Sequence, residues 1–365
     1  MEFLSPGSVL KEGSAVIIVG VYTDKITVSS VRREKGNVVV TATATEPQEG
    51  EAISGGILDV ERIALSCRKA LVALPTVEGG AARNVVFALG GGVGLFSSFH
   101  GKEIRATKEK KISTEELATL IGIHAKEKEG ETSRRIAERF HIDGFAVTDP
   151  VGLNGEEVLI DVVRVACADT LAQSLSHVAA EAGLSVSGFF DMRYAAAKYV
   201  KFLGNTDKNA IVVCVFECEI SIVLVRNGAV VGSGVTSSGY GTIVEAIKKT
   251  FSVGHEEAKE IMRAFANKTL EAHVNKQVED VCSTAGKALI TEVSAVVPML
   301  DRTSLLPGNI WVVSSEDLPQ VDEAFRATEW LTPLPIERNA TIHVWHAPEH
   351  DIFKSAFDLI IAETL

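Results

Sequence analysis

The chain of 365 residues is 46% hydrophobic and 23% charged, a composition that fits a globular protein with two or more packed domains. Its formal net charge of −12 argues against a nucleic-acid partner, because such proteins need a basic face to neutralise phosphates. No apolar stretch has the roughly 18 uncharged residues of a membrane-spanning helix, and the first residues lack the pattern of a secretory signal, so we expect a cytoplasmic protein.

The first predicted element is a β-meander at residues 15–46, AVIIVGVYTDKITVSSVRREKGNVVVTATATE. It reads as strand, short turn, strand, glycine-containing turn and strand. Residues 210–239, AIVVCVFECEISIVLVRNGAVVGSGVTSSG, repeat this layout. Helical patterns follow at 58–74 and 242–251, where apolar residues return every three or four positions. Two meanders that each lead into a helix predict a duplicated α/β architecture.

The next stretch, residues 88–101, is the glycine-rich ALGGGVGLFSSFHG. A glycine-rich loop can hold phosphates, but this one lacks the GK[ST] ending of a P-loop and the order G-x-G-x-x-G of a dinucleotide site. We therefore expect a strand and a turn that lead into the following unit.

A compact α+β unit is predicted between the two repeats. Ser113 and Glu116 fit a capping box that opens a helix toward Ala125. The dense charge of residues 126–135 is typical of a solvated helix or loop. The remaining elements follow in order: a strand at 141–148, a turn with Gly152 and Gly155 at positive φ, a strand at 157–166, and a helix at 169–182 that ends at Gly183.

The last third of the chain is predicted to be mostly helical. Its elements are helices at 255–265 and 274–293, a strand at 309–314, a helix at 318–328 and an amphipathic helix at 350–365. The final helix carries a single lysine, Lys354, against three acidic residues. We therefore expect it to pack on the core and not on a membrane.

Three residue patterns that suggest chemistry have simpler structural interpretations. His343, His346, His350 and Asp351 lie within nine residues, but nothing in the sequence fixes them around one ion, so we expect surface histidines. The five cysteines are scattered without a CxxC pair, which favours buried free thiols. No catalytic triad or nucleophile elbow is present, so we expect no enzyme activity.

Residues 140–186 carry the most specific pattern, FHIDGFAVTDPVGLNGEEVLIDVVRVACADTLAQSLSHVAAEAGLSV. Its turn, the strand that follows and the helix ending in Ala-Gly-Leu resemble the inserted subdomain of the bacterial actin-like family that includes FtsA and PilM. The resemblance is specific over residues 104–186 and extends in outline over residues 15–361. It implies an α/β protein of the actin-like (ASKHA) type, with duplicated ribonuclease-H-like halves and an inserted α+β subdomain of the SHS2 type.

The resemblance also implies domain boundaries. The first half would comprise residues 1–103 and, after the inserted subdomain at 104–186, a returning helix at 187–208. The second half would comprise residues 209–245 and 305–365, with a small helical subdomain at 246–304.

In this family two glycine-containing hairpin turns hold the phosphates of ATP, because backbone N–H groups reach anionic oxygens only where no side chain intervenes. The family patterns D-x-G-T and D-x-G-G-G-T-T are both altered here. In the first hairpin Gly20 stands at the acidic position and Tyr22 at the glycine, and Thr23 alone is kept.

The second hairpin and the adenosine-side turn are altered as well. Cys214 stands at the metal-associated aspartate, Phe216 at the first glycine and Ile220 at a threonine. Ser314 and Ser315 replace the paired glycines of the adenosine-side turn. Nearby carboxylates would oppose a polyanion by on the order of 1 kcal/mol for each exposed contact; they are Glu217, Glu219, Glu316 and Asp317. We therefore expect neither a cofactor nor a metal at these positions.

The resemblance implies an FtsA-like adaptor or scaffold that works without nucleotide and links the cytoplasmic cell-division machinery by protein–protein contacts. Self-association through the inserted subdomain and recruitment to the inner face of the membrane by partners belong to this hypothesis. The first alternative is a PilM-like role, in which a groove beside the inserted subdomain captures an extended peptide from a pilus or secretion machine. The second is an atypical ATP-binding, polymerising protein, in which Thr23 and Gly239 or Gly241 reassemble a site around Mg²⁺.

Overall fold

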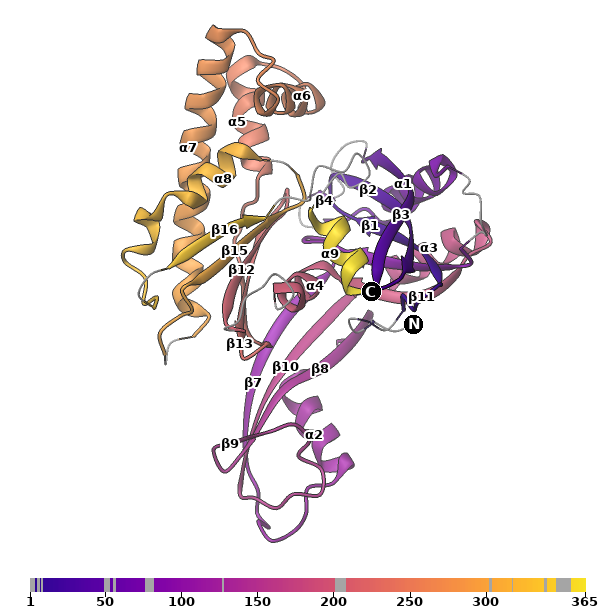
Figure 1. Cartoon of the computed structure of the whole chain (residues 1–365), viewed down its shortest axis with the longest axis vertical. Helices are drawn as coiled ribbons and strands as arrows, with labels where there is room; N and C mark the ends of the chain where they lie inside the picture. Colours follow the sequence, from indigo (N-terminus) through magenta and orange to yellow (C-terminus); the bar gives the residue numbers. More distant parts are fainter. Residues whose placement is uncertain are drawn as a thin grey trace.

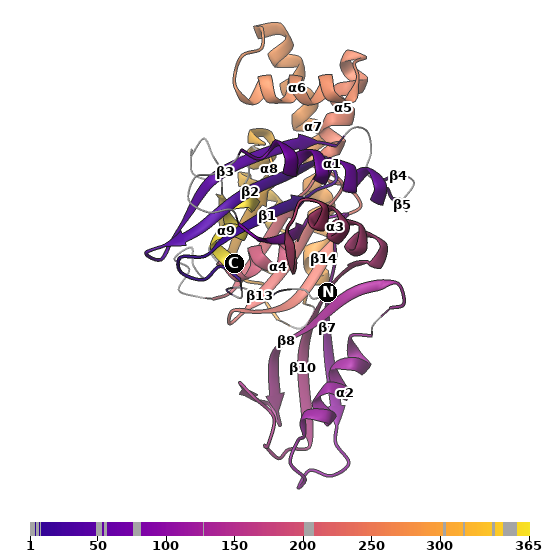
Figure 2. The same cartoon turned by 90° about the vertical axis from the view of Figure 1, so that its right-hand side faces the viewer.

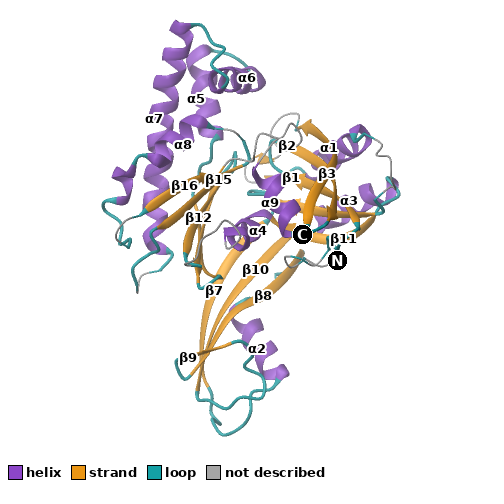
Figure 3. Ribbon diagram, viewed as in Figure 1, coloured by secondary structure: helices purple, strands orange, loops and turns teal. Residues whose placement is uncertain are grey.

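The protein consists of two halves side by side, with a long sheet that projects from their junction (Figure 1). The computed structural model describes residues 4, 7, 9–48, 53–54, 57–75, 82–126, 128–200, 208–301, 304–316, 318–337, 340–345 and 356–365. Helices lie on the outer faces of the sheets, between the two halves and at the far end of the second half (Figure 3).

The first half is built on a five-stranded sheet. Its strand order is β11 (Ser185–Asp191), β6 (Asn84–Leu89), β1 (Ala15–Val21), β2 (Lys25–Glu34) and β3 (Asn37–Pro47). Two helices that contact each other, α1 (Val60–Ala73) and α3 (Asp169–Glu181), cover one face. The other face carries α4 (Met192–Tyr199) and α9 (Ala356–Thr364) (Figure 1). Two short strands, β4 (Ile53–Ser54) and β5 (Ile57–Leu58), precede α1.

The second half repeats this plan. Its strand order is β14 (Ala229–Val235), β13 (Ile220–Arg226), β12 (Ala210–Val215), β15 (Asn309–Ser314) and β16 (Thr341–Trp345). Its helical part contains α5 (Gly241–Phe251), α6 (His255–Ala266), α7 (Ala272–Val296), α8 (Pro319–Arg326) and the 3₁₀ turns Val297–Met299 and Thr328–Leu331. In both halves the first strand pairs antiparallel with the next strand and parallel with a later one. The predicted duplicated α/β architecture is confirmed.

The inserted unit is a four-stranded sheet with one helix. Its strand order is β7 (Leu95–Ile104), β10 (Glu157–Ala168), β8 (Glu131–Ile142) and β9 (Phe145–Val147), and α2 (Thr114–His124) covers one face. The Ser113 hydroxyl accepts the Glu116 N–H at 3.2 Å, so the predicted helix start is confirmed. Figure 2 shows the unit extending away from both halves.

The limits of the units differ from the expected boundaries. The inserted sheet begins with β7 at Leu95 and not at residue 104. Helix α3, expected in the inserted unit, instead buries Leu171 and Leu175 in the core of the first half. The expected start of the helical subdomain, residue 246, falls inside α5. For α3 the cause is burial, because its apolar side chains pack in the core of the first half.

The charged stretch at residues 126–135 is only in part the loop that we expected: residues 128–130 form a loop and turn, but β8 begins at Glu131 and takes up residues 131–135. The side chains of this strand find opposite charges on its neighbour β10. Glu131 pairs with Arg164, and Arg139 Nε lies 2.7 Å from Asp161 Oδ2. Dense charge is therefore compatible with a strand where the adjacent strand supplies counter-ions.

The two turn glycines of the inserted unit have different roles. Gly152 has φ +85°, as expected for a turn glycine. Gly155 is not in the left-handed region; a Cβ atom there would lie 2.1 Å from Ile142 Cγ2. Gly152 is thus required by conformation and Gly155 by close packing.

The last helix packs on the core, as predicted from its composition. In α9, Phe357, Ile360 and Ile361 are fully buried in a core cluster to which both halves contribute residues. Across the described ranges, no helix is long and apolar enough to cross a membrane.

Candidate functional site

The ring of Phe216 occupies the turn between β12 and β13. It is 2% exposed and stacks on Phe357 with 4.9 Å between ring centroids. The turn after β6 also approaches the ring, because a Cβ atom added to Gly91 would lie 2.5 Å from it. The glycine-rich stretch at 88–101 is thus a turn and a strand, as expected, and its glycines make room for an aromatic side chain.

The first hairpin turn is closed by hydrogen bonds to α9. The buried hydroxyl of Tyr22 donates to Asp358 Oδ1 at 3.2 Å, and Thr27 Oγ1 donates to the same oxygen at 2.9 Å. A Cβ atom on Gly20 would lie 2.4 Å from Thr27 Oγ1, so this position requires glycine for packing. Thr23, the one residue kept from the family pattern, is also buried.

The start of α5 meets the second hairpin turn directly. The Tyr240 N–H donates to the Phe216 carbonyl at 3.0 Å, and the Gly241 N–H donates to the Glu217 carbonyl at 2.8 Å. A Cβ atom on Gly239 would lie 2.2 Å from the Phe216 carbonyl oxygen. The N-terminus of a helix is a common phosphate site, but here these N–H groups already have backbone acceptors.

Basic side chains of the protein neutralise the carboxylates around this interface. The bonded pairs are Lys25 with Glu316 at 2.6 Å, Arg193 with Glu219 at 3.2 Å and Lys259 with Glu217 at 3.0 Å. Two of these pairs join the halves, because Lys25 and Arg193 belong to the first half and their partners to the second. The fourth carboxylate of the set, Asp317, lies outside the described residues.

Burial changes the proton affinity of two of these groups. It raises the pKa of the Glu217 carboxyl, as does the nearby Asp24, while Lys259 opposes the shift. Burial lowers the pKa of Lys25, but the carboxylates of Glu316 and Asp24 outweigh it, and the net pKa is raised. Lys25 therefore stays charged inside the interface.

The remaining predicted site residues fall into two groups. Cys214 faces the interface, and burial raises the pKa of its thiol. Ser315 belongs to the same region, because its carbonyl accepts a hydrogen bond from Lys25 Nζ at 2.7 Å. Ser314 ends β15, and its hydroxyl accepts the Glu316 N–H at 3.2 Å. Ile220 is separate, because it lies in the core of the second half.

The sequence did not single out the buried charges that bind the halves together. Asp358 is one of the three acidic residues of the predicted last helix, and it is buried. Arg193 lies in the first turn of α4, two residues after the end of β11, and it is 4% exposed. Single charged residues beside an apolar strand or within an apolar helix were the available signal.

The histidines and cysteines take no part in a common site among the described residues. His343 stacks on Trp311 with 4.3 Å between ring centroids, while His346, His350 and Asp351 lie outside the described residues. All five cysteines are free; Cys218 is half-buried and the other four are buried, as expected.

Tyr240 gives a pH-dependent test of the interface. Its hydroxyl donates to Asp24 Oδ2 at 2.6 Å, and burial together with this carboxylate raises its pKa well above the usual value. A tyrosine in the unfolded chain has a pKa of about 10. Above that pH the unfolded state binds fewer protons than the folded state, so the stability falls as the pH rises.

We expect Tyr240→Phe to flatten this loss of stability above about pH 10. The free energy of unfolding in urea, measured from neutral to alkaline pH, checks the slope. The absorbance of the folded protein at alkaline pH should be unchanged by the substitution, because Tyr240 does not ionise in the fold. A lower absorbance step in the variant would contradict the assignment.

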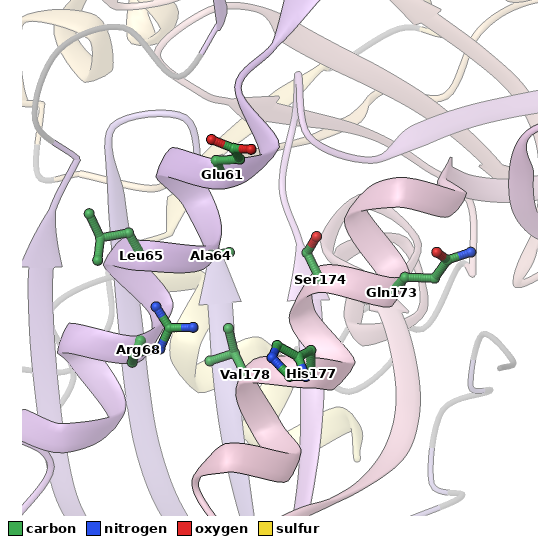
Figure 4. Close-up of a pocket in the computed structure, with 8 residues that line it drawn as sticks. All are labelled: Glu61, Ala64, Leu65, Arg68, Gln173, Ser174, His177 and Val178. Atoms are coloured by element: carbon green, nitrogen blue, oxygen red, sulfur yellow. The ribbon is translucent and has the colours of Figure 1, made fainter.

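A groove of about 460 Å³ lies on the outer surface of the first half, between α1 and α3 (Figure 4). Ala64 and Val178 are at its centre, and Leu65 on its rim is half-exposed. The other residues around it are Glu61, Arg68, Gln173, Ser174 and His177. This surface joins the inserted unit at the start of α3, where Thr132 Oγ1 donates to Asp169 Oδ1 at 2.7 Å.

No protein-family model matches this sequence, and no curated protein matches it. Among solved structures, it is similar to the PilM-PilN type IV pilus biogenesis complex, with a TM-score of 0.65 and 13% identity over 91% of this chain and 88% of that one. It is also similar to the ethanolamine utilization protein EutJ from Carboxydothermus hydrogenoformans, with a TM-score of 0.54 and 15% identity over 100% and 93%. The chain has the actin-like α/β fold.

Proposed function

We propose that this protein is a nucleotide-independent adaptor of the actin fold that works through protein–protein contacts. The observation that carries the proposal is the position of Phe216. Its buried ring stacks on Phe357 and lies against Gly91, in the turn that the family uses for phosphate. A ring and a phosphate group cannot share that volume. The N–H groups at the start of α5 have backbone acceptors, so two further donors are engaged.

A titration with ATP and Mg²⁺ tests nucleotide independence. We expect no heat of binding and no rise in the melting temperature for the natural protein. We also expect none for Phe216→Gly, because the N–H groups of Tyr240 and Gly241 still donate to backbone carbonyls. Phe145→Gly is the matched control, because it removes a phenyl ring that is 76% exposed. Micromolar binding to the natural protein would overturn the proposal in favour of the ATP-binding alternative.

The second candidate function is PilM-like capture of an extended peptide, and the edge of β8 favours it. This strand pairs with β10 along its length but with β9 only at Phe140–Ile142. In the part of the chain that the structure describes, no strand pairs with the outer edge of β8 from Glu131 to Arg139. An extended peptide could add there as a further strand and reach the groove between α1 and α3.

This candidate differs from a division adaptor in its partner. The neighbouring structure is a complex of PilM with PilN, which supports a partner from a pilus machine. A cell-division partner, self-association through the inserted unit and recruitment to the inner face of the membrane belong to the FtsA-like form of the proposal. In either form the protein is cytoplasmic and binds neither nucleic acid nor lipid directly.

Hydrogen exchange locates the partner surface. Peptides that tile the cytoplasmic segments of candidate membrane partners would be added to the full chain. We expect slower exchange of the amides of residues 131–139 when a peptide binds. Strand β3 is the internal control, because it is the edge strand of a different sheet, that of the first half. Protection of β3 with no change in β8 would contradict this assignment.

A further inference from the structure

Glu138 occupies a β-bulge at the base of the inserted unit. The register of β8 against β10 shifts so that Arg139 lies opposite Asp161 and Ala137 opposite Val162, which leaves Glu138 as the extra residue. Its side chain is 3% exposed. A bulge aims its extra side chain away from the regular pattern of the strand, so Glu138 can point toward the body of the protein.

The Glu138 carboxylate is bonded by donors from both halves. The Tyr194 hydroxyl donates to Oε1 at 2.7 Å, and Lys198 Nζ forms an ion pair with Oε2; both residues belong to α4 of the first half. The Val230 N–H of β14, in the second half, donates to Oε2 at 2.9 Å. Lys198 Nζ also donates to the Gly228 carbonyl of the second half at 3.2 Å.

These bonds bring three parts of the protein to one buried carboxylate. Charge-assisted bonds are stronger and more directional than neutral ones, so the carboxylate constrains the relative positions of its donors. Burial and the Glu138 charge raise the pKa of Tyr194 far above its usual range, so its phenol remains a donor. A neutral contact also connects the inserted unit to β14, where the Ser98 N–H donates to Ser233 Oγ at 2.9 Å.

The position of this carboxylate lets it control the orientation of the whole inserted unit. The inserted unit projects far beyond the halves (Figures 1 and 2). Glu138 is bonded to Tyr194 of α4 and Val230 of β14, and so lies at the end of the unit that meets the halves. A small rotation at the base moves the far end of the sheet by a larger distance. We propose that Glu138 fixes the orientation of the inserted unit on both halves at once, and that it does so without a nucleotide.

Spin-label distances in the full chain test this proposal. One label would replace Phe145 in the inserted unit, and the second would replace either Met299 in the second half or Val72 in the first; all three side chains are well exposed. Cys218, the half-buried native thiol, would be changed to serine in every variant. We expect Glu138→Ala to at least double the width of both distance distributions, because Lys198 and Val230 lose their shared acceptor.

Glu131→Gln is the matched control, because its ion pair with Arg164 joins two strands within the inserted unit. It should leave both distributions unchanged. If Glu138→Ala does not fold, Glu138→Gln replaces it in the distance measurements, because glutamine keeps the size of the side chain and removes its charge. Any of three results would overturn the proposal. The distributions could stay unchanged in a folded Glu138 variant, only one of the two label pairs could broaden, or the control could broaden equally.

Discussion

Phe357→Ala should lower the free energy of unfolding by about 3–5 kcal/mol, the usual cost of removing a buried phenyl ring. The ring is fully buried, and it stacks on Phe216 at the point where the two halves meet. Its loss leaves a cavity, because neighbours that belong to different sheets cannot all move into the space. Urea unfolding monitored by circular dichroism measures the change.

The control for this substitution is Phe145→Ala. That ring is 76% exposed, so its removal should change the free energy of unfolding by less than about 0.5 kcal/mol. Equal effects at the two positions would show that Phe357 does not form part of a packed interface. A small effect at both would mean that the halves are held together mainly by their ion pairs.

The regular elements of the fold follow from local patterns in the sequence. Both meanders, the helix start at Ser113 and the helix end at Gly183 depend on residues close together in the chain. Gly183 has φ +71°, which few residues other than glycine adopt without strain. Such signals need no knowledge of distant contacts, and this is why they were predicted correctly.

The sequence pattern did not predict which side chains contact one another at the interface between the halves. The altered positions Tyr22 and Phe216 were identified from the resemblance, but their partners were not. Phe357 and Asp358 come from the last helix, more than a hundred residues away from Phe216 along the chain. Periodicity predicts that a side chain is buried, but it does not predict which distant side chain it contacts.

The charged strand β8 is a second case in which a contact between distant parts of the chain was not predicted. Its residues were assigned to a solvated helix or loop because charges were counted along the chain only. In the structure Glu131 of this stretch forms an ion pair with Arg164 of β10, so the counter-ion lies on the neighbouring strand. A sequence pattern that considers one segment at a time cannot detect such compensation.

Arg193→Ala should also cost about 3–5 kcal/mol of unfolding free energy, because it leaves buried carboxylates without their cation. The Arg193 side chain is 4% exposed and lies 2.6 Å from Asp191 Oδ2 and 3.2 Å from Glu219 Oε1. Chemical denaturation at neutral pH measures the loss. Arg68→Ala is the control, because its pair with Glu181 is exposed and should contribute little to stability.

Arg193→Met separates the charge of this residue from its packing. Methionine fills much of the same volume but cannot neutralise Asp191 or Glu219, so we expect a loss close to that of the alanine variant. Adding Glu219→Gln to Arg193→Met should then recover part of the stability, because one of the unpaired charges is removed. If methionine alone restores the stability of the natural protein, Arg193 acts by packing, and the ion pair between the halves contributes little to holding them together.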